Sequence, residues 1–418
     1  MASDRFSFRL GVVLFAAASA GLSVALISIA KVLLVATALV VLLTKGQRRP
    51  PTNSALATGW TPRLVVLILM AFACSLWWTS APMDHALGVL GKYGKFLTIP
   101  ALLVVVRNRT EASWALVVYA GAQAVLLLSS WLLYFQVPVP WATSRAAMTS
   151  YAVFSSYLDQ GIMSAVVAAV FWHLKSLAPS RGLYYAALAL SLVALGNVFL
   201  LFTGRTGHLV GVAMISLAIV WSLPKRYRLP SLLLPPMIFA AAFFTFDNVA
   251  QRFSGAKNEL SAYAVKPEAV TSTGVRLSFW KTSVELIARE PLKGSGVGSW
   301  ATEYNTIQDQ KTSQREVLQV GSNPHQEFLM WGVQLGLGGI LLLSAFLLAA
   351  CRDLQKLPEP VFNAGFSVVM ALALSCLFNS SLYDAYIGDF FCLSLGILLT
   401  YGIHSRSVRS LSVQPENR

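Results

Sequence analysis

The stretch FRLGVVLFAAASAGLSVALISIAKVLLVATALVVLL, residues 8–43, decides the fold class of this chain. Its 36 residues carry only two charges, those of Arg9 and Lys31. Because the apolar core of a bilayer is about 30 Å thick, one helical crossing needs about 20 residues. The stretch is therefore too long for a single crossing. We expect two helices, at 8–25 and 27–44, joined by a tight turn.

Similar apolar runs recur along nearly the whole chain. Of its 418 residues, 56% are apolar and only 12% are charged, whereas an average soluble protein is about 25% charged. This composition excludes a water-soluble globular enzyme and indicates an all-α polytopic membrane protein. We predict about 12 transmembrane helices, in the ranges 8–25, 27–44, 64–80, 87–106, 113–136, 158–174, 183–203, 208–223, 231–247, 325–350, 361–379 and 386–404.

Membrane topology explains the formal net charge of +14. With the N-terminus in the cytoplasm, 18 Lys and Arg residues fall on the cytoplasmic side, and only Arg145 and Arg205 fall in short loops on the other side. Cytoplasmic segments of membrane proteins are rich in Lys and Arg, so the charge does not require a nucleic-acid partner. The bias predicts that both termini are cytoplasmic.

One connector is much longer than the others and lies on the outer, periplasm-like side in this topology. Apolar residues at helical spacing predict an amphipathic helix within it at about 276–290, which ends before Pro291. Such a helix would lie on the membrane or cover the bundle as a lid. The prediction divides the chain into transmembrane helices 1–9 (1–247), a periplasmic loop (248–324), transmembrane helices 10–12 (325–404) and a cytoplasmic tail (405–418).

Three residues at the outer face are candidates for chemistry. His325 begins a predicted span, where the helix dipole disfavours the imidazolium ion, so we expect a neutral ring that can accept a proton. Arg205 opposes the charge bias and Arg276 begins the loop helix, and a guanidinium group matches phosphate oxygens. The alternatives are a solvated interfacial histidine and arginines that anchor lipid headgroups.

Two aspartates lie at the outer start of the last span. Asp384 and Asp389 either cap that helix or serve in function, which is the usual reason for an ionisable residue inside a span. We predict that Asp389 orients His325 and that Asp384 contacts substrate.

Further basic residues are predicted to help bind an anionic substrate. Lys92 and Lys95 lie near the outer end of their span, where snorkelling toward headgroups is the alternative role. Arg145 lies in an outer loop, and His208 lies beside Arg205.

Together these residues fit glycosyl transfer from a polyprenyl diphosphate. Fixed cations would stabilise the charge that develops on the leaving diphosphate, while the histidine activates a hydroxyl group. Arginines can take the place of a divalent metal ion, and the cysteines lack metal-ligand spacing. We predict neither a metal ion nor another cofactor.

His325-Gln326, followed after nine residues by Gly336 and then by Gly339, resembles the H-[NSQ]-x9-G-x-x-G signature of bacterial O-antigen ligases. The predicted spans, the large loop directly before the histidine, and the arginine in that loop also resemble this family. The resemblance implies a GT-C-class glycosyltransferase fold in the bacterial inner membrane. It further implies metal-independent, inverting transfer of O-antigen polysaccharide from undecaprenyl diphosphate to lipid A–core oligosaccharide in the periplasm.

The resemblance also implies roles for individual residues. His325 would be the general base that activates the acceptor hydroxyl, Arg205 and Arg276 would hold the diphosphate, and Gln326 would bind substrate. The related O-antigen polymerases and protein O-oligosaccharyltransferases share the loop and the histidine, so they remain alternatives. A transporter of lipid-linked glycans is a more remote one, because transporters favour internal repeats and charges at the membrane midplane.

Overall fold

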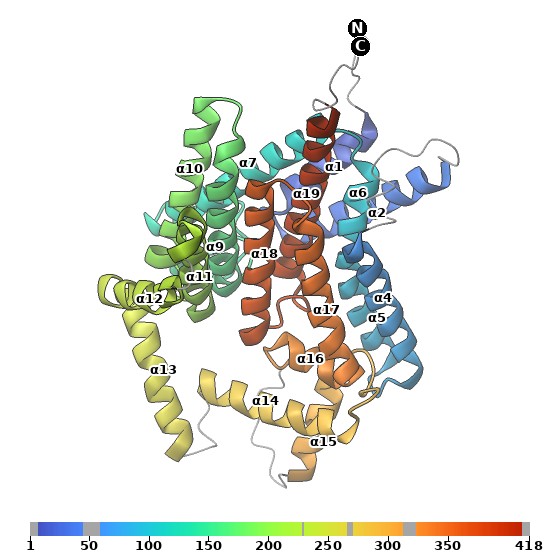
Figure 1. Ribbon diagram of the computed structural model, residues 1–418. Helices are drawn as coiled ribbons and strands as arrows, with labels where there is room; N and C mark the ends of the chain where they lie inside the picture. Colours follow the sequence, from blue (N-terminus) through green and yellow to red (C-terminus); the bar gives the residue numbers. More distant parts are fainter. Residues whose placement is uncertain (1–6, 45–58, 228–229, 266–270, 312–322, 412–418) are drawn as a thin grey trace.

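The computed structural model describes residues 7–44, 59–227, 230–265, 271–311 and 323–411 (Figure 1), and this part of the chain contains helices and no strand. Short 3-10 or π turns extend several of the helices. In chain order the helices are α1 (Phe8–Ser19), α2 (Val24–Thr44), α4 (Trp60–Cys74), α5 (Met83–Tyr93), α6 (Thr98–Val105), α7 (Arg109–Tyr134), α8 (Ala147–Ser150), α9 (Tyr157–Leu174), α10 (Arg181–Gly196), α11 (Arg205–Ser222), α12 (Leu234–Thr245), α13 (Asp247–Val265), α14 (Ser272–Arg289), α15 (Trp300–Lys311), α16 (Glu327–Leu335), α17 (Leu337–Leu354), α18 (Glu359–Phe378) and α19 (Ala385–Leu411).

Several helices begin at a residue whose side chain caps the first turn. Asn108 accepts a hydrogen bond from the backbone of Glu111, and Thr271 accepts one from the backbone of Gly274. Such caps satisfy N–H groups that have no partner within the helix. The polar residues between the apolar runs therefore set where the helices start.

Nine helical segments in the described residues are long and apolar enough to cross a membrane. The protein is therefore a polytopic membrane protein, with nine such segments in place of the 12 predicted. Helices α1 and α12 have only 12 residues each. Helix α9 has 18 residues but carries Asp159, Gln160 and His173, and it packs against α10, α11 and α18. A helix covered by other helices can hold more polar residues than one that faces lipid.

Contacts between distant segments define one end of the bundle. Arg9 of α1 donates to the carbonyl of Val105 and to the carboxylate of Glu111. At the same end of the bundle, Arg406 of α19 donates to the carbonyl of Lys356, just after the end of α17, over 3.2 Å. These residues all come from segments that the charge bias assigns to the cytoplasm.

The long loop lies at the other end, where Figure 1 shows α14 and α15 beneath the bundle. The indole of Trp78 donates to the carbonyl of Lys293 over 3.1 Å, and the backbone of Ser80 donates to that of Ser295 over 3.0 Å. This separation of the loop from α1 and the end of α19 agrees with the predicted topology. The orientation in the membrane remains a prediction from charge, and part of that charge lies in 1–6, 45–58 and 412–418, outside the described residues. The predicted loop helix at about 276–290 corresponds to α14.

The range 325–350, predicted as one span, is two helices that meet at a corner. Gly336 separates α16 from α17 with φ 66° and ψ −158°, a backbone conformation that is essentially restricted to glycine. A Cβ atom at Gly339 would lie 2.2 Å from the carbonyl oxygen of Trp331. The two glycines of the motif therefore allow α17 to fold closely against α16, and His325 stands at the start of the short helix.

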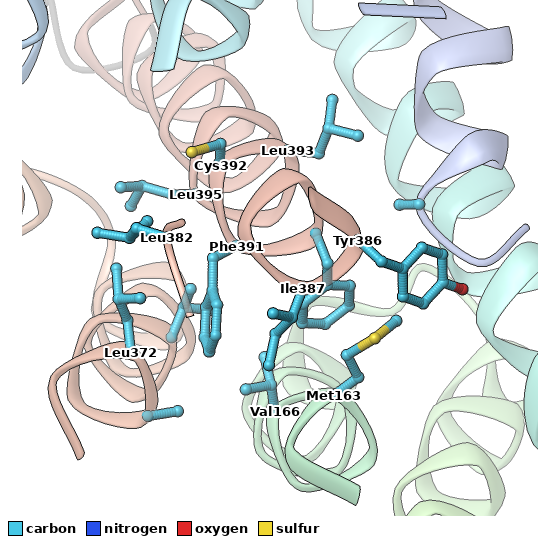
Figure 2. Packing of buried hydrophobic residues seen from close by; sticks show 14 of the residues in the cluster. Met163, Val166, Leu372, Leu382, Tyr386, Ile387, Phe391, Cys392, Leu393 and Leu395 are labelled. Carbon is cyan, nitrogen blue, oxygen red and sulfur yellow. The ribbon is translucent and has the colours of Figure 1, made fainter. Parts of the chain in front are cut away.

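Helix α19 is the centre of the bundle. Figure 2 shows Ile387 and Phe391 of α19 near Met163 and Val166 of α9 and Leu372 of α18. Because lipid tails are as apolar as these side chains, close packing rather than the hydrophobic effect holds such helices together. This packing fixes the start of α19, and with it the connector between α18 and α19.

The corner at Gly336 can be tested with two neighbouring glycines. Gly336→Ala should destabilise the protein by about 1–3 kcal/mol or more, because an L-residue is strained there and its Cβ would lie 2.5 Å from the carbonyl oxygen of Pro291. Gly338→Ala is the matched control: it is exposed, helical and has no atom within 4 Å of the added Cβ. We expect it to be neutral or to stabilise by up to about 1 kcal/mol. Thermal unfolding of the purified protein in detergent measures both changes, and equal melting temperatures would contradict the corner.

Candidate functional site

His325 is held in place by the loop helix. Its backbone has φ 52°, which is uncommon for a residue other than glycine, and its N–H donates to Oδ1 of Asn323 over 2.8 Å. From α14, the indole of Trp280 donates to the carbonyl of Pro324 over 3.1 Å, and the ring of Phe279 stacks on that of His325 with centroids 6.3 Å apart. The long loop therefore positions the histidine that follows it.

The ring of His325 is neutral near pH 7. Burial, and secondly the charge of Arg276, lower its pKa to about 4. The expected neutrality therefore has a different main cause from the helix dipole. Among the described residues no group makes a hydrogen bond to the ring nitrogens, so the ring can accept a proton from a bound molecule.

Arg276 lies between His325 and a second arginine. Its Nη1 donates to the carbonyl of Phe378 over 3.2 Å, the last residue of α18. Burial, and next the charge of Arg205, lower the pKa of the Arg276 guanidinium, which nevertheless stays charged at neutral pH. Because the guanidinium groups of Arg276 and Arg205 lie near enough to repel each other, together they favour a negatively charged ligand.

Arg205 begins α11 and is fixed by the long loop. Its Nη2 lies 2.9 Å from Oε1 of Glu259, its Nη1 donates to Thr273 over 3.0 Å, and its Nε donates to the carbonyl of Arg252 over 3.0 Å. Burial raises the pKa of Glu259, but hydrogen bonds from Thr273 and Arg205 outweigh it and lower that pKa overall. The sequence shows no acidic partner near Arg205, whereas the fold brings Glu259 to it.

A third arginine was missed by sequence reasoning. Arg252 of α13 donates from Nε to the carbonyl of Thr203 over 2.8 Å and from Nη2 to the hydroxyl of Tyr157 over 2.9 Å. It is half-buried beside the start of α11. The only signal in the sequence was its place in the outer loop, where basic residues carry little information about topology.

Glu327 was also missed, although it follows His325 by two residues. Its side chain is fully buried. It accepts hydrogen bonds from the backbones of Leu382 and Tyr383 over 2.8 and 3.1 Å, and from the indole of Trp331 over 2.8 Å. Burial raises its pKa to about 7, despite these hydrogen bonds, which lower it. An ionisable residue in an apolar run is usually functional, and that signal was available in the sequence.

Asp389 does not orient His325, so that prediction is wrong. Both carboxylate oxygens of Asp389 lie 3.1 Å from Nζ of Lys31 in α2, and the side chain is 1% exposed. Lys31 neutralises the buried carboxylate of Asp389, and the presence of that carboxylate within a span was the reason for predicting a functional role. The pair joins α2 to α19 within the bundle.

The two lysines near the start of α19 differ from each other. Lys95 is fully buried and donates from Nζ to the backbone carbonyl of Asp384 over 2.6 Å. It neither reaches the headgroups nor points at a free anion site, since it supports the turn that carries Asp384. Nζ of Lys92 lies 3.9 Å from the ring centroid of Tyr383, a cation–π contact.

Asp384 is half-buried in that turn. Burial, and next the carboxylate of Asp159, raise its pKa to about 6, while Lys95 and Lys92 lower it. Its side chain receives no hydrogen bond from the described residues. It is therefore available to a bound molecule.

Three other predicted site residues lie apart or have structural contacts. His208 is 1% exposed, its Nε2 lies 3.0 Å from the carbonyl of Phe202, and it stacks on Phe199, so it belongs to the core. Gln326 caps α16 through its side-chain oxygen, which accepts from the backbone of Leu329 over 2.5 Å. Arg145 is exposed between α7 and α8 and contacts none of the described site residues.

The candidate site therefore consists of His325 with Arg276 and Arg205, supported by Arg252 and bordered by the α18–α19 connector. Within the described residues, no group of three or more His, Cys, Asp or Glu side chains is arranged to hold a metal ion. The arrangement can bind an anion next to a neutral proton acceptor.

Comparison with known proteins identifies the segment that carries this site. No curated protein matches the chain. Residues 189–344 match the family model described as O-antigen ligase. The matched segment runs from α10 into α17 and includes the arginines, the histidine and both glycines of the motif. The chain therefore contains an O-antigen ligase family domain at residues 189–344.

Proposed function

We propose that the protein is an O-antigen ligase of the bacterial inner membrane. It transfers O-antigen polysaccharide from undecaprenyl diphosphate to a sugar hydroxyl of lipid A–core oligosaccharide on the periplasmic face. We assign it to the GT-C class, with inverting and metal-independent transfer. One observation carries the proposal: a neutral imidazole without a hydrogen-bond partner among the described residues lies near Arg276, and Arg276 in turn lies near Arg205.

The chemistry follows from these charges. A ring nitrogen of His325 takes the proton of the acceptor hydroxyl as its oxygen attacks the anomeric carbon. The bond from that carbon to the diphosphate oxygen breaks, and the diphosphate leaves with the electron pair. Arg276 makes only one hydrogen bond within the described part of the chain, so most of its N–H groups can bind the oxygens on which charge develops.

The low pKa of His325 fits a mechanism in which the donor binds before the histidine takes up a proton. Without donor, Arg276 disfavours the imidazolium ion and the histidine is a weak base. A bound diphosphate offsets the positive charge of the arginines, and a nearby anion raises the pKa of a histidine. His325 therefore becomes an effective base when the donor is in place.

The first test uses variants of the histidine and of one arginine in a strain that lacks the protein. His325→Asn removes the base, and asparagine tolerates the positive φ at this position; we expect a loss of about 100-fold or more. Arg276→Lys keeps the charge but loses the planar fork, so we expect a comparable loss. Arg289→Lys is the control, because Arg289 lies on the same helix with 47% of its side chain exposed.

The glycolipid profile of the strain is the measurement. We expect the strain that lacks the protein to make core without long chains. The wild type and Arg289→Lys should restore the long chains, whereas the other two variants should not. Core with one repeat would indicate an O-antigen polymerase. Normal lipopolysaccharide with under-glycosylated protein would indicate a protein O-oligosaccharyltransferase.

The second test is the pH dependence of kcat/KM, which reports the free enzyme. The imidazolium ion cannot act as base, so the loss of activity that depends on His325 should occur as pH falls through about 4, below the losses expected from protonation of Glu327 near 7 and of Asp384 near 6. Arg276→Gln removes a cation, which favours the imidazolium ion, so the same loss should move to higher pH. Absence of this lowest limb in the wild type, or no movement of it in Arg276→Gln, would contradict the coupling.

A further inference from the structure

A second polar cluster lies beside the histidine–arginine site and has no role in the mechanism above. It consists of Asp384 in the α18–α19 connector, Asp159 in the first turn of α9, and Tyr386 in the first turn of α19. The carboxylate of Asp159 accepts from the hydroxyl of Ser155 over 2.6 Å. It is close enough to act electrostatically on both Asp384 and Tyr386. These groups come from two helices but share one location.

The cluster contains polar groups that lack partners. The hydroxyl of Tyr386 is buried and finds no hydrogen-bond partner among the described residues, and the residue is only 3% exposed. The hydroxyls of Ser380 and Ser381, in the connector that leads to Asp384, are also buried and have no partner in the part of the chain that the structure describes. Leaving a buried polar group unpaired is energetically costly. Three unpaired hydroxyls on the connector and the first turn of α19, next to the carboxyl groups of Asp384 and Asp159, indicate that a polar molecule binds there.

The charges of the cluster select the chemistry of that molecule. The carboxyl groups of Asp159 and Asp384 act on each other with the same sign, and Lys92 and Lys95 both act on Asp384 with the opposite sign. The opposing charges leave little net preference for a cation or an anion. Carboxylates accept and hydroxyls both donate and accept hydrogen bonds. Carboxyl groups beside unpaired hydroxyls therefore suit a sugar, which is a neutral molecule with several hydroxyl groups.

The connector places this cluster next to the reacting groups. Leu382 and Tyr383, directly before Asp384, donate their backbone N–H groups to Glu327, two residues after His325. At the other end of the connector, Phe378 accepts from Arg276. Arg276 of α14 lies near the histidine, with Arg205 of α11 next to it, and the Asp384 turn is joined to the histidine through α16. A donor diphosphate at the arginines would thus leave the Asp384 turn for the other substrate.

We propose that Asp384, Asp159 and the hydroxyl of Tyr386 form the subsite that binds the hydroxyl groups of the acceptor sugar beside His325. This inference rests on the proposed function, because that function makes a sugar the acceptor. Asp384 binds substrate directly. Lys95 and Glu327 are positioning residues that hold the turn.

The test compares three aspartate variants in the purified full-length protein. Asp384→Asn and Asp159→Asn keep the shape of the side chain but remove the charge. Asp84→Asn is the control, because Asp84 is an exposed aspartate of α5 at the same end of the bundle. Initial rates are measured with undecaprenyl-diphosphate-linked O-antigen and lipid A–core, each varied in turn. Binding of core oligosaccharide freed from lipid A is measured separately by calorimetry.

For both cluster variants we expect the KM for lipid A–core and the Kd for free core oligosaccharide to rise about tenfold or more, since hydrogen bonds to charged groups are among the stronger ones. The KM for the donor should stay within about twofold, as should all constants of the control. A tenfold rise in the donor KM with no change in acceptor binding would overturn the inference, as would unchanged constants. Failure of the wild type to transfer glycan to lipid A–core would instead refute the proposed function.

Tyr386→Phe tests the subsite with a variant that should fold as the wild type does. It removes only a buried hydroxyl that no described residue binds, so the melting temperature should be unchanged or higher. The acceptor KM should nevertheless rise several-fold, with the donor KM unchanged. A stable Tyr386→Phe protein with the wild-type acceptor KM would remove this hydroxyl from the subsite and contradict the proposal.

Discussion

The carboxylate of Glu327 is the contact on which the arrangement of the site depends. It lies at the start of α16, two residues after His325, and binds the backbones of Leu382 and Tyr383 in the connector that starts α19. Three donors stabilise a buried group whose desolvation is costly, and the raised pKa of about 7 reflects that cost. Without this carboxylate two backbone N–H groups would be buried and unpaired. The histidine, held from one side by α14, would then lose its fixed relation to the connector.

The sequence correctly predicted an all-helical polytopic membrane protein, because that prediction depends on local composition. It predicted 12 spans where nine described helical segments have the required length and hydropathy. Hydropathy measures apolar length and does not show whether a helix lies inside the protein, as α9 does. It also could not distinguish the corner at Gly336 from an unbroken span, since the surrounding residues are apolar on both sides of it.

The site was predictable where a residue broke a local rule. Arg205 opposed the charge bias, Arg276 began the loop helix and His325 opened a motif, and the structure brings these residues together. Partners distant in sequence were not predictable: Asp389 pairs with Lys31, which precedes it by 358 residues. A carboxylate that is already paired looks the same in sequence as one that is free, and this is why Asp389 was predicted to orient His325 although Lys31 binds it.

The most direct test of the central claim is an experimental structure of the full chain in a lipid nanodisc with undecaprenyl diphosphate bound. The account predicts diphosphate oxygens within about 3 Å of the guanidinium groups of Arg276 and Arg205. The ring of His325 should lie beside the terminal phosphate, on the side from which an acceptor approaches. Diphosphate bound away from both arginines, or separated from His325 by other elements of the fold, would contradict the account.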